Sequence, residues 1–124
     1  EDADALANLS MYMIRKQAFD EARPFVQRGT LIDPFHVRLR VARTVLMAVD
    51  GNGDDAQREL ERLGALYADG YEALMYAGLI AVEQNDSARA LKNLEAYVAI
   101  APQKEQPPFL RMALAQLRQP SGGQ

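Results

Sequence analysis

The chain has no cysteine and only one histidine, His36, among its 124 residues. The absence of cysteine excludes disulfide bonds, thiolate zinc sites and cysteine nucleophiles. It fits the cytosol and equally the periplasm, so the compartment stays open. A single histidine leaves no two-histidine metal site and no relay between imidazoles. We therefore expect no catalytic residues, no metal site and no cofactor, and we expect His36 to be a solvated or helix-capping side chain.

The sequence also lacks a strong charge of either sign and a long apolar run. Its net charge of -3 offers no basic field for nucleic acid and no polybasic anchor for a membrane. No apolar run approaches the roughly 18 to 20 residues that span a bilayer. The 48% hydrophobic and 25% charged residues are typical of one globular domain. The chain begins at Glu1 without a methionine or a signal-peptide pattern, so we expect a piece of a longer protein.

The acidic stretch at residues 50–55, DGNGDD, has the alternating oxygen ligands of a calcium-binding loop. Glu61 stands where the twelfth, bidentate carboxylate of such a loop would lie. The sixth loop position, however, requires glycine for its sharp bend, and Asp55 is there. Gln57 occupies the eighth position, which is usually β-branched or leucine. We therefore favour a turn between two helices over an ion site.

A period of 34 residues runs through the chain. Ala22, Ala56 and Ala90 are spaced by 34 and again by 34, and Pro34 and Pro102 stand twice that distance apart. Apolar residues at helical spacing predict paired helices within each period. The six predicted helices cover residues 3–15, 20–31, 34–49, 54–67, 70–84 and 87–100.

A seventh helix is predicted after Pro107 and Pro108, which preset the entry into a first helical turn. The residues that follow carry an apolar stripe at helical spacing. Because an end of a stacked array exposes apolar surface, we expect this helix to cover the last helix pair. The stripe consists of Leu110, Ala113, Leu114 and Leu117.

The periodic pattern resembles the tetratricopeptide repeat, a 34-residue helix-turn-helix unit, over about five-sixths of the chain. The first repeat carries the resemblance at Leu6, Leu9, Ser10, Met13, Ala22, Val26, Gly29 and Pro34. The third carries it at Leu74, Ala77, Gly78, Ala81, Ala90, Leu94, Tyr97 and Pro102. The resemblance implies an all-α solenoid of three helix pairs with a C-terminal capping helix. Its expected parts are one domain at 3–118, repeats at 3–35, 36–70 and 71–104, a capping helix at 107–118 and a disordered tail at 119–124.

The middle repeat departs from the family pattern. An unbroken count of 34 puts Arg40 and Arg43 at two core positions, where unpaired guanidinium groups are very costly. A shift of one residue brings Leu39, Ala42 and Leu46 to the core positions instead. The shift predicts one extra residue in the turn at 50–55, and it places one set of side chains on a common face away from the core: Arg40, Thr44 and Met47.

This turn needs only ordinary helix-terminal chemistry. Gly51 and Gly53 allow the positive φ that a lengthened turn requires. Asp54 or Asp55 can cap the next helix by accepting hydrogen bonds from its first free amides.

The first helices of such an array line a concave groove that receives peptides or helices. The family's lysine and asparagine clamp for peptide carboxylates is absent, because its positions hold Ala7, Met11, Val41, Glu72 and Tyr76. The remaining lining is apolar and rich in adaptable methionine. The groove residues that the resemblance implies are Asn8, Met11, Ile14, Arg15, Arg40, Val41, Thr44, Met47, Met75, Tyr76, Leu79 and Val82.

The leading hypothesis is a non-catalytic module that binds an amphipathic helix or an extended apolar segment of a partner protein. Residues 71–117 are similar to the repeat region of bacterial cytochrome c maturation proteins, and the chain is also similar to small chaperones of type III secretion. No motif decides between these subfamilies. The alternative hypothesis is a structural module that forms homo-dimers or larger assemblies through the groove or the ends of the array.

Overall fold

The computed structural model describes residues 2–119, which form seven α-helices, two short 3₁₀ turns and no strand. The all-α fold class predicted from the sequence is confirmed. Part of the predicted tail, residues 120–124, lies outside the described residues. The elements are α1 (Ala3–Arg15), α2 (Phe19–Ile32), α3 (Val37–Val49), α4 (Gly53–Leu66), η1 (Ala68–Gly70), α5 (Glu72–Glu83), α6 (Ser87–Ile100), η2 (Gln103–Glu105) and α7 (Phe109–Arg118).

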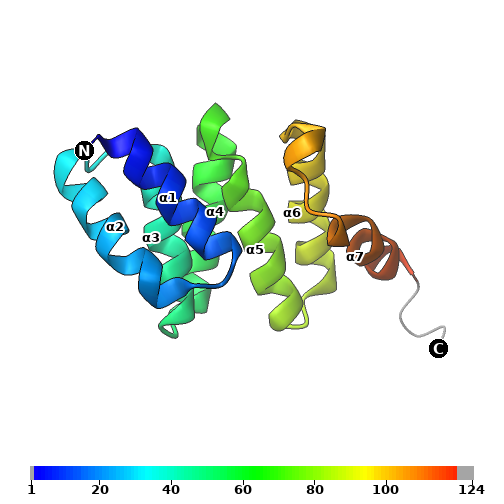
Figure 1. Ribbon diagram of the computed structural model, residues 1–124. Helices are drawn as coiled ribbons and strands as arrows, with labels where there is room; N and C mark the ends of the chain where they lie inside the picture. The colour runs from blue at the N-terminus through cyan, green and yellow to red at the C-terminus, as the bar shows by residue number, and fades with distance from the viewer. Residues whose placement is uncertain (1, 120–124) are drawn as a thin grey trace.

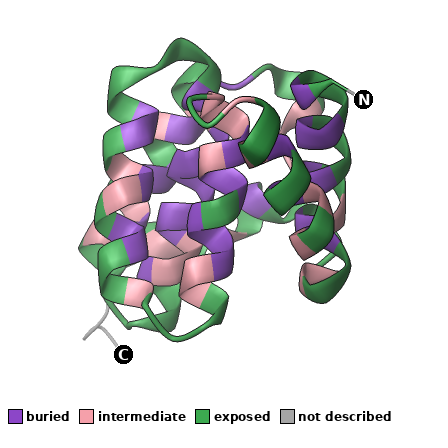
Figure 2. Ribbon diagram, turned by 90° about the vertical axis from the view of Figure 1, so that its left-hand side faces the viewer, coloured by how far each residue is buried: buried purple, intermediate pink, exposed green. Residues whose placement is uncertain are grey.

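The helices follow one another along an array, with α1 and α2 at one end and α7 at the other (Figure 1). Each helix packs on its successor in the chain, and α1 also packs on α3 and α3 on α5. Buried positions gather where helices face one another, while many outer positions and the turns are exposed (Figure 2). Within residues 2–119, each helix is too short or too polar to cross a lipid bilayer.

The three turns inside the repeats have the same length and conformation. Gln17, Gly51 and Asn85 adopt positive φ of 61°, 104° and 59°, and they are 34 residues apart. Each donates its amide to the carbonyl three residues earlier, at 2.9 to 3.1 Å. The prediction of an extra residue in the turn at 50–55 is therefore wrong. Gly51 adopts this left-handed conformation without the steric cost that a Cβ brings.

The acidic side chains of this turn connect helices. Asp50 accepts two hydrogen bonds from the guanidinium of Arg23 in α2, at 2.7 and 3.0 Å. Asp54 accepts one from Gln84 of α5 at 2.9 Å. The predicted cap by Asp54 or Asp55 is wrong: α4 begins at Gly53, its N-cap is Asn52, and no side chain accepts the capping hydrogen bond. Among residues 2–119, no group of His, Asp or Glu side chains could hold a metal ion.

Helix α3 keeps the predicted apolar stripe but differs from the prediction at Thr44. Leu39, Ala42 and Leu46 are buried, as expected. Thr44 was expected on an outer face, yet it is only 3% exposed, and its hydroxyl donates to the carbonyl of Arg40 at 2.7 Å. The unbroken 34-residue register explains this burial, because Thr44 then matches Ser10 and Gly78, which are also buried small residues.

Arg40 remains in this register because its charge has partners. Its guanidinium lies 3.4 Å from the carboxylate of Glu59 on α4 and 5.8 Å from the ring centre of Tyr67. The charge is thus only half-buried and is compensated by an ion pair and a cation–π contact. Because of these partners, an arginine at this position requires no shift of the helix.

Neighbouring repeats approach closely because a glycine in one meets a leucine in the next. A methyl group on Gly29 would lie 2.6 Å from Leu39, and one on Gly64 would lie 2.5 Å from Leu74. These glycines lie in the last turn of successive second helices, and these leucines lie in the first turn of successive first helices. Because glycine has no side chain, each leucine packs directly against the backbone of the preceding repeat. This contact fixes how one repeat packs on the next.

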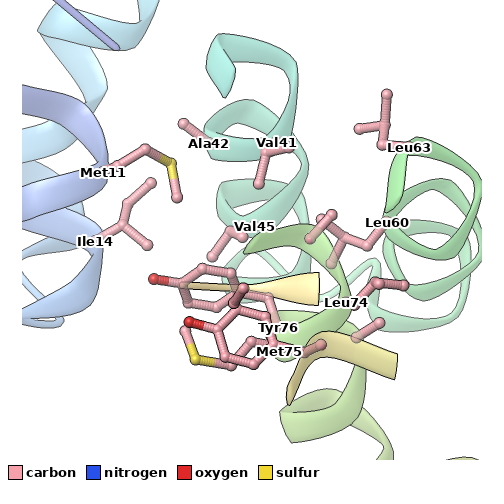
Figure 3. Packing of buried hydrophobic residues seen from close by; sticks show 14 of the residues in the cluster. Met11, Ile14, Val41, Ala42, Val45, Leu60, Leu63, Leu74, Met75 and Tyr76 are labelled. Atoms are coloured by element: carbon pink, nitrogen blue, oxygen red, sulfur yellow. The ribbon is translucent and has the colours of Figure 1, made fainter. Parts of the chain in front are cut away.

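The core is continuous from the first repeat to the third. Met11 and Ile14 of α1 face Val45 of α3, and Met75 and Tyr76 of α5 extend the same cluster (Figure 3). Since the cluster crosses repeat boundaries, no helix pair buries its apolar stripe by itself.

Substitution of Gly78 tests the same kind of glycine–leucine contact between α5 and α6, the two helices of the third repeat. A methyl group there would lie 2.6 Å from two atoms of Leu94, so Gly78→Ala overpacks the contact between α5 and α6. Overpacking costs about 1–3 kcal/mol, and the better helix propensity of alanine offsets about 1 kcal/mol of it. We expect urea unfolding to show a free energy lower by up to about 2 kcal/mol. Gly53→Ala is the control, because its methyl group meets only Gln84 at 3.4 Å. Equal loss in both variants would contradict the packing account.

Candidate functional site

An apolar cleft of about 790 Å³ opens on the side of the array formed by α1, α3 and α5, which we call the inner face. Each repeat contributes its first helix, and the start of α7 closes one side. Polar and charged groups border the cleft, whereas its centre is aliphatic and aromatic. The lining residues are Ile14, Arg15, Gln17, Phe19, Val45, Ala48, Val49, Gly53, Met75, Tyr76, Leu79, Ile80, Glu83, Gln84, Pro107 and Phe109.

A second, polar cleft of about 450 Å³ lies beside it, nearer the N-terminal ends of α3 and α5. Arg15 lines both clefts and therefore stands at their boundary. The residues that line the polar cleft are Asn8, Met11, Tyr12, Arg15, Arg38, Asp69, Tyr71, Glu72 and Glu105.

The charges in the polar cleft are paired with one another. Arg38 donates to the carboxylate of Glu72 at 3.0 Å and also to the amide oxygen of Asn8. Arg15 lies 3.7 Å from the other oxygen of Glu72. Both arginines thus contact the protein's own Glu72. Their charges are compensated without a guest.

The segment between α6 and α7, residues 101–108, reaches the inner face at this boundary; we call it the strap. Its Glu105 carbonyl oxygen accepts a hydrogen bond from Arg15 at 2.9 Å and a long one from the Tyr97 hydroxyl at 3.5 Å. The Glu105 carboxylate accepts a hydrogen bond from the hydroxyl of Tyr71. Pro107 lines the apolar cleft. The strap thus connects the last repeat to the end of α1, 90 residues earlier in the chain.

The hydroxyl of Tyr76 is buried without a hydrogen-bond partner. The residue is 9% exposed and lines the apolar cleft. Burial raises the pKa of Tyr76 to about 12, and the negative charge of Glu72 acts in the same direction. Arg15 is close enough to oppose this shift in pKa. A guanidinium can only donate, so the hydroxyl proton of Tyr76 loses water and gains no protein acceptor.

The predicted groove residues are distributed over several parts of the structure. Ile14, Arg15, Met75, Tyr76 and Leu79 line the apolar cleft, and Asn8 and Met11 line the polar cleft together with Arg15. Val41 is buried in the core. The other four lie elsewhere: Arg40 against α4, Thr44 inside the helix packing, Met47 in an outer cleft between α2 and α3, and Val82 exposed on α5.

The one-residue shift that was applied to α3 explains why three of these positions leave the inner face. In the unbroken register, α3 presents residues that lie 34 positions after Asp4, Met11, Ile14 and Arg15. The structure places these residues in the two clefts: Arg38, Val45, Ala48 and Val49. A strict count of 34 could have found them. No such signal exists for Glu105 or Phe109, because the repeat pattern ends at Pro102.

His36 has the helix-capping role expected from the sequence. It is the N-cap of α3, and its Nδ1 accepts a hydrogen bond from the amide of Leu39 at 3.4 Å. Its Nε2 lies 2.7 Å from the carboxylate of Asp4, which joins α3 to α1. Both ring nitrogens are therefore engaged in structural contacts.

No protein-family model matches the chain, and a search of curated proteins finds no match. Several solved structures are similar to it. One is the type III secretion chaperone SycD from Yersinia enterocolitica, in complex with a peptide of the translocator YopD. Its TM-score is 0.62, with 13% sequence identity, and the similarity covers 93% of this chain and 91% of that chain. YrrB, described as a tetratricopeptide-repeat protein with an unusual peptide-binding site, has a TM-score of 0.61 and 18% identity over 94% of this chain.

The chain has the tetratricopeptide-repeat fold. Similarity across more than nine-tenths of the chain covers all three helix pairs. The chain spans 58% of the length of YrrB. At these identities the similarity concerns the fold alone, and the subfamily within the tetratricopeptide repeats is undecided.

Two tyrosines on the inner face should respond in opposite ways to loss of their hydroxyls. An unsatisfied buried polar group costs about 1–3 kcal/mol, so we expect Tyr76→Phe to raise the free energy of unfolding by about 1 kcal/mol. Tyr71→Phe removes a hydrogen bond to a carboxylate and should lower it by about 1–2 kcal/mol. Thermal and urea unfolding measure both changes. A loss of stability in Tyr76→Phe would show that its hydroxyl has a partner after all.

Proposed function

We propose that the protein is a non-catalytic interaction module, and that the apolar cleft of its inner face binds an apolar or amphipathic segment of a partner protein. One observation carries this proposal: an open apolar cleft of about 790 Å³ to which the first helices of all three repeats contribute. Clefts of this size, apolar with a few polar groups at the edge, are typical ligand sites.

Exposed apolar side chains at the edge of the cleft support the proposal. Val49 is 45% exposed and Phe109 is 47% exposed, and both line the cleft. Met75 and Leu79 lie further inside. A guest that covers these side chains gains the free energy of removing apolar surface from water, which drives most protein association.

The arrangement of charged groups supports a binding role over catalysis. Within residues 2–119, the arginines and acids of the inner face are engaged mainly in ion pairs and hydrogen bonds with one another. His36 caps a helix and contacts Asp4 outside both clefts. No cysteine is present, and no serine, threonine, lysine or histidine lines either cleft.

The solved structures with this fold add support of a general kind. SycD is in complex with a peptide of YopD, and YrrB is described by its peptide-binding site. A protein or peptide partner fits these neighbours, and neither nucleic acid nor membrane insertion is needed for the proposed role.

Two valines with the same exposure provide a matched test. Val49 lies in the apolar cleft and Val82 lies outside it, and each is 45% exposed. The partner is first identified by affinity capture and mass spectrometry, and its affinity is then measured by calorimetry. We expect Val49→Glu to weaken binding at least about tenfold, because a charge placed in the apolar contact loses its hydration. Val82→Glu should leave the affinity within about twofold of the wild type.

The comparison is valid only if both variants melt as the wild type does. Equal affinities for the wild type and Val49→Glu would refute the assignment of the partner to this cleft. Loss of binding in Val82→Glu alone would move the binding surface to the part of α5 that lies outside the cleft.

A second candidate function, self-association, has one observation in its favour. Leu31 and Phe35, at the end of α2 and in the following turn, are 85% and 80% exposed. Light scattering over a range of protein concentrations distinguishes the two functions. The proposed peptide-binding role predicts a monomer throughout. A dimer that dissociates in the double variant Leu31→Glu, Phe35→Glu would instead favour assembly through this end of the array.

A further inference from the structure

The strap occupies the inner face where the two clefts meet. Glu105 lines the polar cleft, Pro107 lines the apolar cleft, and Arg15 contacts the strap from the boundary between them. Residues of the strap therefore separate two clefts that are otherwise neighbours on the same three helices. Without the strap, the inner face would be one longer groove.

The contacts that hold the strap are few and polar. Arg15 and Tyr97 donate to one backbone carbonyl, and Tyr71 donates to one carboxylate, all of them on Glu105. The remaining strap hydrogen bonds run within the strap or to the adjoining end of α6. Half of the strap residues are exposed, three are half-buried and only Ala101 is buried. Segments with few buried apolar contacts open at a lower free energy than the core does.

The closed strap also leaves a polar group unsatisfied. The Tyr76 hydroxyl is inaccessible and unpaired beside Arg15, whose guanidinium is bound to the strap. Opening of the strap would free Arg15 and admit water or a guest carbonyl to this hydroxyl. The desolvation penalty of the hydroxyl therefore favours opening, against the hydrogen bonds on Glu105 that favour closure.

We propose that residues 101–108 form a displaceable strap, which fills the centre of the inner face in the free protein and is replaced there by the partner segment. This inference rests on the proposed function. A guest that takes the place of the strap is expected to be extended rather than helical, because Arg15 and Tyr97 bind a backbone carbonyl that a helix interior would not offer. Displacement joins the polar and apolar clefts into one groove.

Two neighbouring residues of η2 provide a matched pair of variants. Glu105→Gly removes the side-chain hydrogen bond to Tyr71 and loosens the turn. Lys104→Gly loosens the same turn, but Lys104 is exposed and makes no cross-face contact. Neither substitution touches α1, α3 or α5.

Hydrogen exchange measures strap opening without any guest. The amide of Gln106 donates to the Gln103 carbonyl at 3.1 Å, so its protection factor reports the strap turn that the contacts of Glu105 hold against the inner face. We expect protection to fall at least about tenfold in Glu105→Gly relative to Lys104→Gly, as loss of a hydrogen bond to a charged group implies. Tyr76→Phe should raise the protection, because closure then leaves no hydroxyl unpaired. Equal protection in the two glycine variants would overturn the proposal.

A synthetic peptide of residues 101–110, labelled at its N-terminus, serves as the probe for guest binding to the full chain. Because it has the chemistry of the strap, we expect fluorescence anisotropy to show about tenfold tighter binding to Glu105→Gly than to Lys104→Gly. Equal binding to both would show that the strap does not compete for this site. Neither experiment uses the natural partner, so a failure here is distinguishable from a failure of the cleft assignment tested by Val49→Glu.

Discussion

The close approach of successive helix pairs is the constraint on which the inner face depends. Leu39 and Leu74 lie in the first turn of successive first helices, and each packs against a glycine, Gly29 or Gly64, of the preceding repeat. A larger side chain at either glycine would push the repeats apart. Because the contact recurs, α1, α3 and α5 come to line the same face, and their side chains form both clefts.

Arg15 shows how the charges of this face are organised. It is the last residue of α1, lines both clefts, lies near Glu72 of α5 and binds the Glu105 carbonyl of the strap. One side chain thus connects the first repeat, the third repeat and the segment that follows them. Glu72 compensates both arginines of the polar cleft, whereas apolar side chains such as Val49 and Phe109 stay exposed in the apolar cleft.

The sequence predicted the helices well because their signals are local and periodic. The 34-residue spacing of Ala22, Ala56 and Ala90 located all six paired helices to within about three residues of their observed ends. The predicted register of α3 was less accurate. The sequence does not show that Glu59 and Tyr67 contact Arg40 and make its burial possible. The predicted one-residue shift therefore selects three groove residues that lie off the inner face.

The sequence by itself determined the all-α class, the repeat period and the sites of the turns, because backbone hydrogen bonds and apolar periodicity act over a few residues. Only the tertiary structure decided which side chains meet across repeats. The contact of Arg15 with Glu105 joins residues 90 positions apart and has no periodic signal. The burial of the Tyr76 hydroxyl without a hydrogen-bond partner likewise depends on residues that are distant in the sequence. The residues next to Tyr76 in the chain do not determine whether its hydroxyl finds a partner.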